Sequence, residues 1–571
     1  MKILLLSVAL ALGVSAQETL IRQVYDPVTD THVEVLALFT KASPGGYFPL
    51  RVKIANNTKS DRRVSLDFES LAGYGSEIRT RSSFDLSATA GKAVTRDILV
   101  PLPPPGGSNP ILKTNLTGQL GEGSHHLQSG TDPAQPAVLL SEALFTPNAS
   151  TLDSEIATKF SSSYGGKSEF AGKFDPKQVP DDWLAFSGYD SVVMTDDDWS
   201  DIPPGGKNAI LSWVRLGGQL LVYTSGSATA AALGLPEDAG FGSIAMPAKS
   251  LAPTLDAAEL VREVTDNKTK PRQVSIRDDF QGGWPLQKHF GGKTFRYGLF
   301  VFVLVIFAIV VGPINLFVFA KSGSRHKLFI TTPLISLAAS LILIVIIIVQ
   351  DGFGGDGMRR VLMEVRPDAG VNAAYVHQEQ FSRTGVLTAA DFTLATPAIF
   401  SPVPIMKSRW ARFTDGAGAQ GNFNLQPEGG QFSVAGDWWQ SRSEHGHILS
   451  AVISTRGRIE TTDAPNTFLS TFEHPIDTLF YLDAEGQWHR ADGITAGKRF
   501  KLAAVDPTMA LPALAREAMT FGNRNRQFME TAVKRRGHFV ALATRAPGIA
   551  THPGIRWQET LTVITGPIVA P

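Results

Sequence analysis

A run of acidic residues offers the clearest candidate for chemistry in this sequence. The stretch YDSVVMTDDDW predicts a buried strand that ends in Thr195, Asp196 and Asp198. Ser225 follows the next predicted strand, QLLVY, at the same edge of the sheet. Ligands of parallel α/β sheets bind at the carboxyl ends of the strands, and clustered carboxylates can hold Mg²⁺ or Ca²⁺. We therefore expect a ligand crevice at these four residues. The alternative is a solvated acidic loop that caps the next helix, so no metal ligand is assigned.

Other residue types that perform chemistry give little support for an enzyme. The chain has no cysteine, which excludes disulfides, thiolate nucleophiles and Cys-ligated metal sites. His445 and His447 in the motif EHGH would share one face of a strand, a spacing that can bind metal, but no third ligand is identifiable. We interpret them as surface histidines. The sequence thus assigns no catalytic residue, no cofactor and no metal site.

The bulk composition limits the classes of protein that remain. Lys plus Arg and Asp plus Glu both total 53, a balance that argues against a nucleic-acid partner. With 571 residues the chain exceeds one hydrophobic core, and 53 glycines with 35 prolines favour turn-rich β domains. We expect several domains, most of them rich in strands.

Two apolar segments, 299–320 and 329–350, dominate the middle of the chain. Neither contains a charged residue, and as helices each would extend about 33 Å, enough to cross a hydrocarbon core of about 30 Å. The basic linker KSGSRHKL separates them. The sequence predicts a transmembrane hairpin over 298–350, because helices of soluble proteins rarely stay apolar on every face.

Three residues interrupt the first span. Pro313 should kink the helix, Gly312 should let the neighbouring helix approach closely, and Asn315 should bond across the hairpin. A role for Asn315 in a transport path is disfavoured because two spans cannot enclose a pore. We interpret Gly312, Pro313 and Asn315 as hairpin packing.

The start of the sequence sets the expected topology. Residues 1–16 have a basic start, an apolar core and small residues before Gln17, the pattern of a secretory signal peptide. The linker would then face the cytoplasm, in agreement with its basic charge. We expect a multi-pass protein of the bacterial cytoplasmic (inner) membrane, mostly extracytoplasmic, whose partners are the lipid bilayer and envelope proteins.

The regions outside the hairpin fall into three domains. Short alternating strands over 17–135 predict an Ig-like β-sandwich. Alternating strands and helices over 136–285 predict a parallel α/β sheet. Residues 360–571 predict a β-rich extracytoplasmic domain, with one irregular helical region over 511–537.

Residues 189–226, YDSVVMTDDDWSDIPPGGKNAILSWVRLGGQLLVYTSG, resemble the class I glutamine amidotransferase-like fold, a flavodoxin-like α/β fold. The resemblance implies a Cys nucleophile that this chain lacks, so the chemistry is not carried over. The order of GGYFPLRVKIAN, SWVRLGGQLLVY, VGPINLFVF and KLFITTPLISL also resembles that of uncharacterised bacterial envelope membrane proteins, which implies no known activity.

These observations favour a non-enzymatic function. We expect an integral membrane scaffold, or an accessory subunit of a bacterial envelope or transport complex, with extracytoplasmic binding domains. One alternative is an envelope hydrolase with its site at the edge of the α/β domain. The other is a ligand sensor coupled through the transmembrane hairpin.

Overall fold

The chain forms two structural units, Met1–Gln273 and Val274–Pro571. The computed structural model describes residues 18–72, 78–104, 110–128, 130–132, 135–159, 170–224, 229–247, 254–265, 271–280, 283–293, 297–368, 371–403, 405 and 421–570. The predicted signal peptide at 1–16 lies outside the described residues.

The first unit begins with two antiparallel sheets of four strands each. One sheet has the order β1 (Glu18–Asp26), β2 (Thr31–Ala37), β3 (Tyr47–Asn56) and β6 (Lys92–Pro101). The other runs β5 (Ile78–Ala88), β4 (Arg62–Leu71), β7 (Ile111–Gly118) and β8 (Gly123–Leu127). In β4, Val64, Leu66 and Phe68 are buried and alternate with more exposed residues. This period of two turns one face of each sheet toward a common core.

A parallel α/β layer follows in the same unit, as the sequence predicts. Its strand order is β10 (Ala171–Phe174), β9 (Val138–Ser141), β11 (Ser191–Thr195), β12 (Gln219–Tyr223) and β13 (Ser243–Ala245). All neighbouring pairs are parallel. This is the 2-1-3-4-5 order of doubly wound, flavodoxin-like sheets. Strands β9, β11 and β12 are buried along their whole length, because both faces of the sheet are covered.

Different elements cover the two faces of this sheet. Helices α1 (Glu142–Lys159) and α4 (Ala257–Thr265) pack on the face that carries Val193 and Leu221. Helix α3 (Pro204–Arg215) packs on the opposite face, and its core is continuous with that of the sandwich. Helices α1 and α4 therefore cover one face of the parallel sheet, and α3 together with the two antiparallel sheets covers the other.

Aromatic packing and one arginine join the sandwich to the α/β layer. The ring of Phe186 lies 5.3 Å from that of Phe39 and 6.0 Å from that of Trp213, centroid to centroid. The Arg272 guanidinium donates hydrogen bonds to the carbonyls of Pro44, Gly45 and Gly188, at 2.6, 2.9 and 2.9 Å. These contacts make the two layers one body.

The second unit is built on a large mixed sheet. Its main path is β17 (Ala398–Val403), β20 (Glu444–Ser454), β15 (Val371–Thr384), β14 (Gly355–Asp368), β28 (Ile555–Val569), β27 (His538–Ala543), β23 (Ile476–Leu482), β24 (Trp488–Ile494) and β26 (Ala503–Ala504). Strands β21 (Ile459–Thr461), β22 (Thr467–Ser470) and β25 (Arg499–Lys501) extend it. Along the main path β14 pairs with β28 in parallel, and the other neighbours are antiparallel.

Smaller elements complete this unit. Strands β16 (Phe392–Leu394), β19 (Gln431–Gly436) and β18 (Gly421–Glu428) pair in an antiparallel ladder. The predicted helical region 511–537 is two helices, α9 (Pro507–Ala518) and α10 (Asn523–Ala532). The molecule is thus a multidomain, β-rich protein, as its turn-rich composition predicts.

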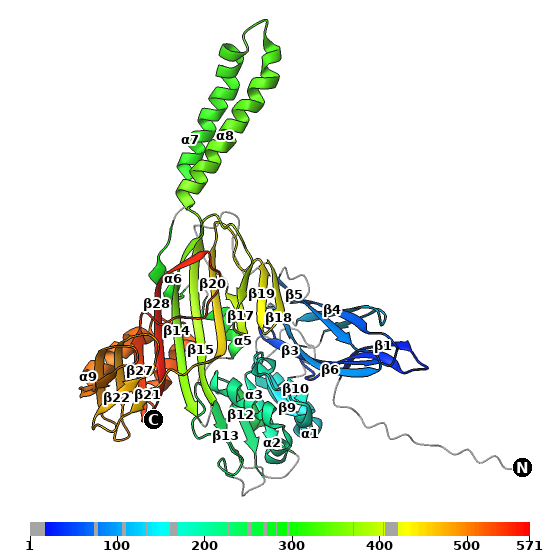
Figure 1. The fold of residues 1–571 in the computed structure, drawn as a ribbon, viewed down its shortest axis with the longest axis vertical. Coiled ribbons are helices and arrows are strands. Elements are labelled where there is room, and N and C mark those ends of the chain that lie inside the picture. Colours follow the sequence, from blue (N-terminus) through cyan, green and yellow to red (C-terminus); the bar gives the residue numbers. More distant parts are fainter. Residues whose placement is uncertain are drawn as a thin grey trace, which may run out of the picture. The chain divides into compact units, whose positions relative to one another are not determined.

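A helical hairpin extends from the end of the second unit's sheet at which β14 begins (Figure 1). It contains α7 (Tyr297–Ile309), the π-helix η3 (Val310–Phe319), the short turn η4 (Arg325–Lys327) and α8 (Leu328–Asp351). Two helical stretches, Gly298–Phe319 and Arg325–Asp351, are long and apolar enough to cross a membrane. Large apolar side chains lie exposed on both, among them Phe317 at 71% and Val349 at 80%.

The interruption in the first span differs in part from the sequence-based expectation. Pro313 lies inside the π-helix η3, so the helix widens there. Asn315 is fully buried, accepts a hydrogen bond from Thr331 Oγ1 at 2.6 Å and donates one to Thr332 Oγ1 at 2.9 Å. The expectation for Gly312 is not met. A Cβ at this position would meet no atom within 4 Å, because Gly312 lies on an exposed face of the helix.

The close approach of the sandwich to the α/β layer generates a prediction. A Cβ on Gly46 would lie 2.3 Å from the backbone nitrogen of Gly188, so the backbone would have to shift. We expect Gly46→Ala to lower the free energy of unfolding by about 2–3 kcal/mol. In the control Gly91→Ala, φ is +69° but no atom lies within 4 Å, so backbone strain alone should cost about 1 kcal/mol. Thermal unfolding of the full chain in detergent measures both, and equal losses would contradict tight packing at this junction.

Candidate functional site

At the predicted crevice of the α/β sheet, Thr195 and Asp198 cap a helix. Thr195 is the N-cap of helix α2 (Asp196–Asp201), and its hydroxyl accepts a hydrogen bond from the backbone N–H of Asp198 at 3.1 Å. The Asp198 carboxylate accepts in return from the Thr195 backbone N–H at 3.0 Å, which completes a capping box. Ser141, at the end of β9, donates to the same carboxylate at 2.6 Å.

The observed geometry corresponds to the helix-capping alternative. Asp198 lies between the ends of β9 and β11, where a doubly wound sheet offers its ligand crevice. Asp196 begins α2, and its carboxylate accepts from the backbone N–H of Asp197. Ser225 lies outside the described residues. Among the residues that the structure describes, no group of three or more His, Asp or Glu side chains could hold a metal ion.

The histidines of EHGH are not the surface residues that the sequence suggests. His447 is 1% exposed, and its ring centroid lies 4.2 Å from that of Trp439 and 5.0 Å from that of Phe400. Its Nε2 lies 2.9 Å from the carbonyl oxygen of Trp438. Burial lowers the pKa of His447 well below its usual range, and it lowers the pKa of His445 to about 4. Both imidazoles are therefore neutral at physiological pH; His447 is part of an aromatic core, whereas His445 is half-buried beside it.

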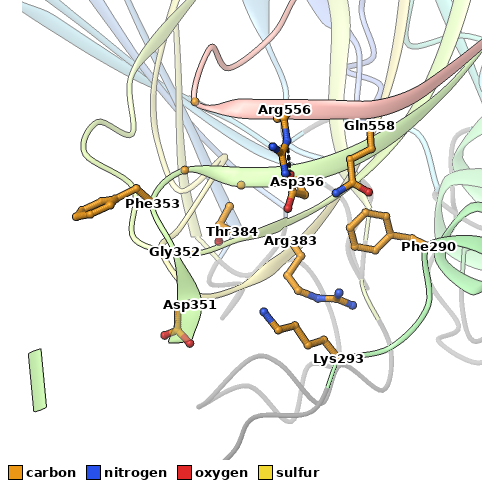
Figure 2. A pocket seen from close by; sticks show the side chains of 14 residues that line it. Phe290, Lys293, Asp351, Gly352, Phe353, Asp356, Arg383, Thr384, Arg556 and Gln558 are labelled. Carbon is orange, nitrogen blue, oxygen red and sulfur yellow. Dashed lines mark hydrogen bonds and ion pairs between the residues drawn. The ribbon is translucent and has the colours of Figure 1, made fainter. Parts of the chain in front are cut away.

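The strongest candidate site is a pocket of about 520 Å³ at the base of the hairpin, which we call the hairpin-base pocket (Figure 2). Its walls come from the segment before α7, the end of α8, and the adjoining ends of β14, β15 and β28. The lining residues are Phe290, Lys293, Asp351, Gly352, Phe353, Gly354, Gly355, Asp356, Arg383, Thr384, Gly385, Gly554, Arg556 and Gln558.

Strand register brings these distant residues together. Asp356 pairs with Arg383 in the β14–β15 ladder and with Arg556 in the parallel β14–β28 ladder. Phe290 ends helix α6 (Pro285–Phe290), and Asp351 is the last residue of α8. Four segments, taken from between Phe290 and Gln558, thus converge at one end of the sheet.

Close backbone contacts hold the end of α8 against the sheet. The Gly352 carbonyl accepts from the N–H of Val386, and the Gly354 N–H donates to the Val386 carbonyl, both at 2.9 Å. A Cβ on Gly385 would lie 2.3 Å from the Gly352 oxygen, so only glycine fits there. The hairpin therefore leaves the sheet without a flexible connection at this end.

Ion pairs organise the charges of the pocket. Asp351 has a fully buried side chain and lies 2.5 Å from Arg442. The Arg383 guanidinium lies 2.6 Å from Glu444 and 4.9 Å from the centroid of the Phe290 ring. In Figure 2, Arg383 and Lys293 lie on the same side of the pocket, whereas Arg556 lies beside Asp356, to which its Nη2 is 2.8 Å.

A buried carboxylate ties the other end of the hairpin to the same sheet. Glu379 on β15 accepts hydrogen bonds from Trp284 Nε1 at 2.7 Å, from the Gly522 N–H at 2.9 Å and from Asn525 Nδ2 at 2.7 Å. Trp284 and Glu379 are both fully buried. Burial raises the pKa of Glu379, and these three donors offset part of the rise because they stabilise the ionised form.

Sequence reasoning missed both the pocket and this clamp. The pocket needs the β14–β28 pairing, which joins residues about 200 positions apart and leaves no local pattern. The sequence offers only two indications of the pocket: Lys293 lies before the first span, and a glycine-rich segment follows the second span. The capping role of Asp198 could be predicted from the sequence. A threonine followed three residues later by an acidic residue, here Thr195 and Asp198, is a capping-box pattern.

Comparison with known proteins adds no assignment. No protein-family model and no curated protein matches the sequence. Among solved structures, a cycloisomaltooligosaccharide glucanotransferase of Paenibacillus sp. is 10% identical over 33% of this chain and 27% of its own, with a TM-score of 0.17. A calcium-binding mutant of Bacteroides uniformis beta-glucuronidase 2 is 8% identical over 42% of this chain and 25% of its own, with a TM-score of 0.14. The chain thus matches about a quarter of the length of each protein.

The two carboxylates of the pocket should differ sharply in their effect on stability. We expect Asp351→Asn to cost about 3 kcal/mol, because it leaves the largely buried Arg442 without its counter-charge. Asp356→Asn is the matched control, since its ion pair with Arg556 is exposed at 41% and 77% and should be worth less than about 1 kcal/mol. Thermal midpoints of the purified full chain measure the difference. If Asp356→Asn lowered the thermal midpoint as much as Asp351→Asn, burial of the Asp351–Arg442 pair would not be the cause of the loss.

The buried His447 predicts a particular pH dependence. Below its ordinary pKa of 6.5 the unfolded chain binds a proton that the folded chain does not, so the free energy of unfolding should fall as the pH falls. The slope from one such histidine is about 1.4 kcal/mol per pH unit. We expect His447→Phe, measured by denaturant unfolding between pH 6.5 and pH 5, to have a slope smaller by about this amount. Parallel curves for the two proteins would contradict a buried, neutral His447.

Proposed function

We propose that this chain is a two-span integral membrane protein of the bacterial envelope. It would act as a non-enzymatic scaffold or as an accessory subunit of an envelope or transport complex, with both structural units on the extracytoplasmic side. The observation that carries the proposal is the exposed apolar hairpin whose two ends are tied to one sheet. Apolar side chains exposed on every face of two long helices are stable in lipid and not in water.

The ties at the two ends support an anchoring role. Trp284 and Glu379 fix the chain before the first span, and Asp351 with Arg442 fixes it after the second. Glu379 lies on β15, and Val386, two residues after the end of β15, donates a hydrogen bond to the carbonyl of Gly352 beside Asp351. A hairpin held in this way sets the position of the large sheet at the membrane surface, which is what a scaffold requires.

Strand order supports the proposed identities of the domains in the first unit. The sheets β2-β3-β6 and β5-β4-β7-β8 have the alternating antiparallel arrangement of an Ig-like sandwich, with β1 added at one edge. The 2-1-3-4-5 parallel sheet has the topology expected of an amidotransferase-like domain. The domain lacks the cysteine nucleophile, and Asp198 caps a helix between the ends of β9 and β11. We therefore propose that it binds partners or acts as a spacer.

The rival function, an envelope hydrolase at this edge, finds less support. A hydrolytic carboxylate must be accessible to substrate or water. Asp198 instead accepts hydrogen bonds from Ser141 and from both the backbone N–H and the hydroxyl of Thr195. These bonds commit the carboxylate to the start of α2.

Topology is the direct test of the proposal, and the absence of native cysteine makes it simple. Single-cysteine variants at the exposed positions Ser87, Ser322 and Thr495 would report on the first unit, the linker and the second unit. We expect a membrane-impermeant maleimide to label Ser87→Cys and Thr495→Cys in intact spheroplasts, and Ser322→Cys only after detergent is added. Labelling of Ser322→Cys in intact spheroplasts, or protection of either of the other two, would refute the proposed topology.

A further inference from the structure

Arg359 on β14 is a half-buried cation with no carboxylate beside it among the described residues. Its Nε donates a hydrogen bond to Thr560 Oγ1 and its Nη1 donates one to the Ile549 carbonyl, both at 3.3 Å. Its guanidinium carbon lies 4.7 Å from the centroid of the Trp557 ring. Burial lowers the pKa of Arg359 to about 10, and no neighbouring negative charge raises it again.

Five other arginines of the second unit have shielded side chains, and each has a carboxylate partner. Their side chains are at most 16% exposed. The pairs are Arg360 with Glu559, Arg366 with Glu364, Arg383 with Glu444, Arg442 with Asp351 and Arg535 with Glu364. A shielded charge without a partner is costly, because nothing compensates for the water that it loses. Within the described part of the chain, Arg359 departs from this pattern, and an anion is the partner that would complete it.

The loop between β27 and β28 holds the Arg359 guanidinium in one position. Gln378 on β15 accepts a hydrogen bond from the Ile549 N–H at 2.7 Å and donates one to the Ile549 carbonyl at 3.1 Å. The same carbonyl accepts from Arg359. A Cβ on Gly548 would lie 2.4 Å from Gln378 Oε1, so the loop packs closely on the sheet. A cation that is preorganised in this way binds an anion at a lower cost in side-chain entropy than a mobile one.

The surroundings of Arg359 suit a segment of another protein. Trp557 is half-buried, and Pro547 and Ala550 in the adjoining loop are exposed. Tryptophan and arginine are the residue types that most often dominate binding energy in protein interfaces, where apolar neighbours exclude water from them. A guanidinium that stacks on an aromatic ring and keeps N–H groups free can bind both oxygens of one carboxylate. These features favour the side chain of an aspartate or glutamate that is flanked by apolar residues.

From these observations we infer that Arg359 and Trp557 form the centre of a docking surface for an acidic segment of another envelope protein. Arg359 pairs with a carboxylate of that segment, and Trp557, Pro547 and Ala550 contact the apolar residues around it. This inference rests on the proposed function and deepens it. An accessory subunit needs a contact with its partner, and the docking surface supplies one outside the membrane.

Photo-crosslinking in the bacterium that carries this protein tests the docking surface. The chain has no cysteine, so Ala550→Cys provides a single attachment point near Arg359 for a membrane-impermeant benzophenone maleimide. After intact spheroplasts are irradiated, peptide mass spectrometry identifies the cross-linked segment. We expect one partner protein, cross-linked next to an aspartate or glutamate.

Variants of the Ala550→Cys chain show whether charge recognition produces the cross-link. Arg359→Gln should reduce its yield about tenfold, as expected for a residue that dominates an interface. The matched control Arg556→Gln changes an exposed arginine that is paired with Asp356, and it should leave the yield unchanged. Replacement of the identified acidic residue of the partner by arginine should abolish the cross-link, and Arg359→Glu should then restore it.

Thermal unfolding of the full chain in detergent separates a binding role from a structural role. Arg359→Met removes a charge without leaving a carboxylate unpaired, so the thermal midpoint should stay the same or rise. Arg383→Met leaves Glu444 without its counter-charge and should lower the midpoint by several degrees. A loss for Arg359→Met as large as that for Arg383→Met would assign Arg359 to folding and overturn the inference.

The remaining outcomes of the cross-linking experiment also overturn the inference. A missing cross-link, or a yield that does not depend on Arg359, would mean that no acidic partner docks here. A cross-link to a neutral or basic segment, to lipid alone or to the chain itself would identify a different neighbour. If the maleimide does not reach Ala550→Cys from outside the cell, the topology of the proposed function fails as well. Labelling without an acidic cross-link refutes only the docking surface.

Discussion

The structure depends on a solvation constraint at its centre. Two helices that together cover Gly298–Phe319 and Arg325–Asp351 expose leucine, isoleucine, valine and phenylalanine on every face. Each exposed apolar side chain would cost about 1.5–3 kcal/mol in water relative to an apolar surrounding, which favours a membrane location for the hairpin. Inside that apolar surface the one buried polar side chain of the first span, Asn315, is satisfied by Thr331 and Thr332. Both ends of the Asn315 side-chain amide are therefore satisfied within the hairpin, where lipid could not supply a partner.

Buried polar contacts before the first span and at the end of the second join the hairpin to the rest of the second unit. Glu379 accepts hydrogen bonds from Trp284, in the segment before the first span, and from Gly522 and Asn525 at the start of α10. Asp351 and Arg442 form a largely buried pair at the other end. Buried pairs of this kind add little net stability but define one geometry, since any other leaves a charge buried without a partner. The sheet is thus fixed relative to the membrane anchor by a few buried polar contacts.

Sequence reasoning succeeded where a feature is local and periodic. The apolar spans and the parallel strands of the α/β layer could be predicted because continuous apolar runs have few alternative structures. It failed where burial depends on distant segments. His447 is buried because Phe400 and Trp439 from other turns and strands cover it, and the pocket exists because β14 pairs with β28. The sequence left Asp198 between a ligand crevice and a helix cap, because a capping box and a metal site use the same residue types.

The first unit shows how a fold can keep the topology of a ligand-binding sheet without an open site. At its carboxyl edge Asp198 is hydrogen-bonded to Thr195 and Ser141, and α3 with the antiparallel sheets covers one face of the parallel sheet. In the described part of the second unit, a pocket of about 520 Å³ lies at the base of the hairpin. The central claim is that the hairpin is embedded in a bilayer, and alkaline carbonate extraction of membranes from cells that express the full chain tests it most directly. The account predicts that the protein stays in the membrane pellet and floats with lipid in a density gradient. Release of the intact chain into the carbonate supernatant would contradict it.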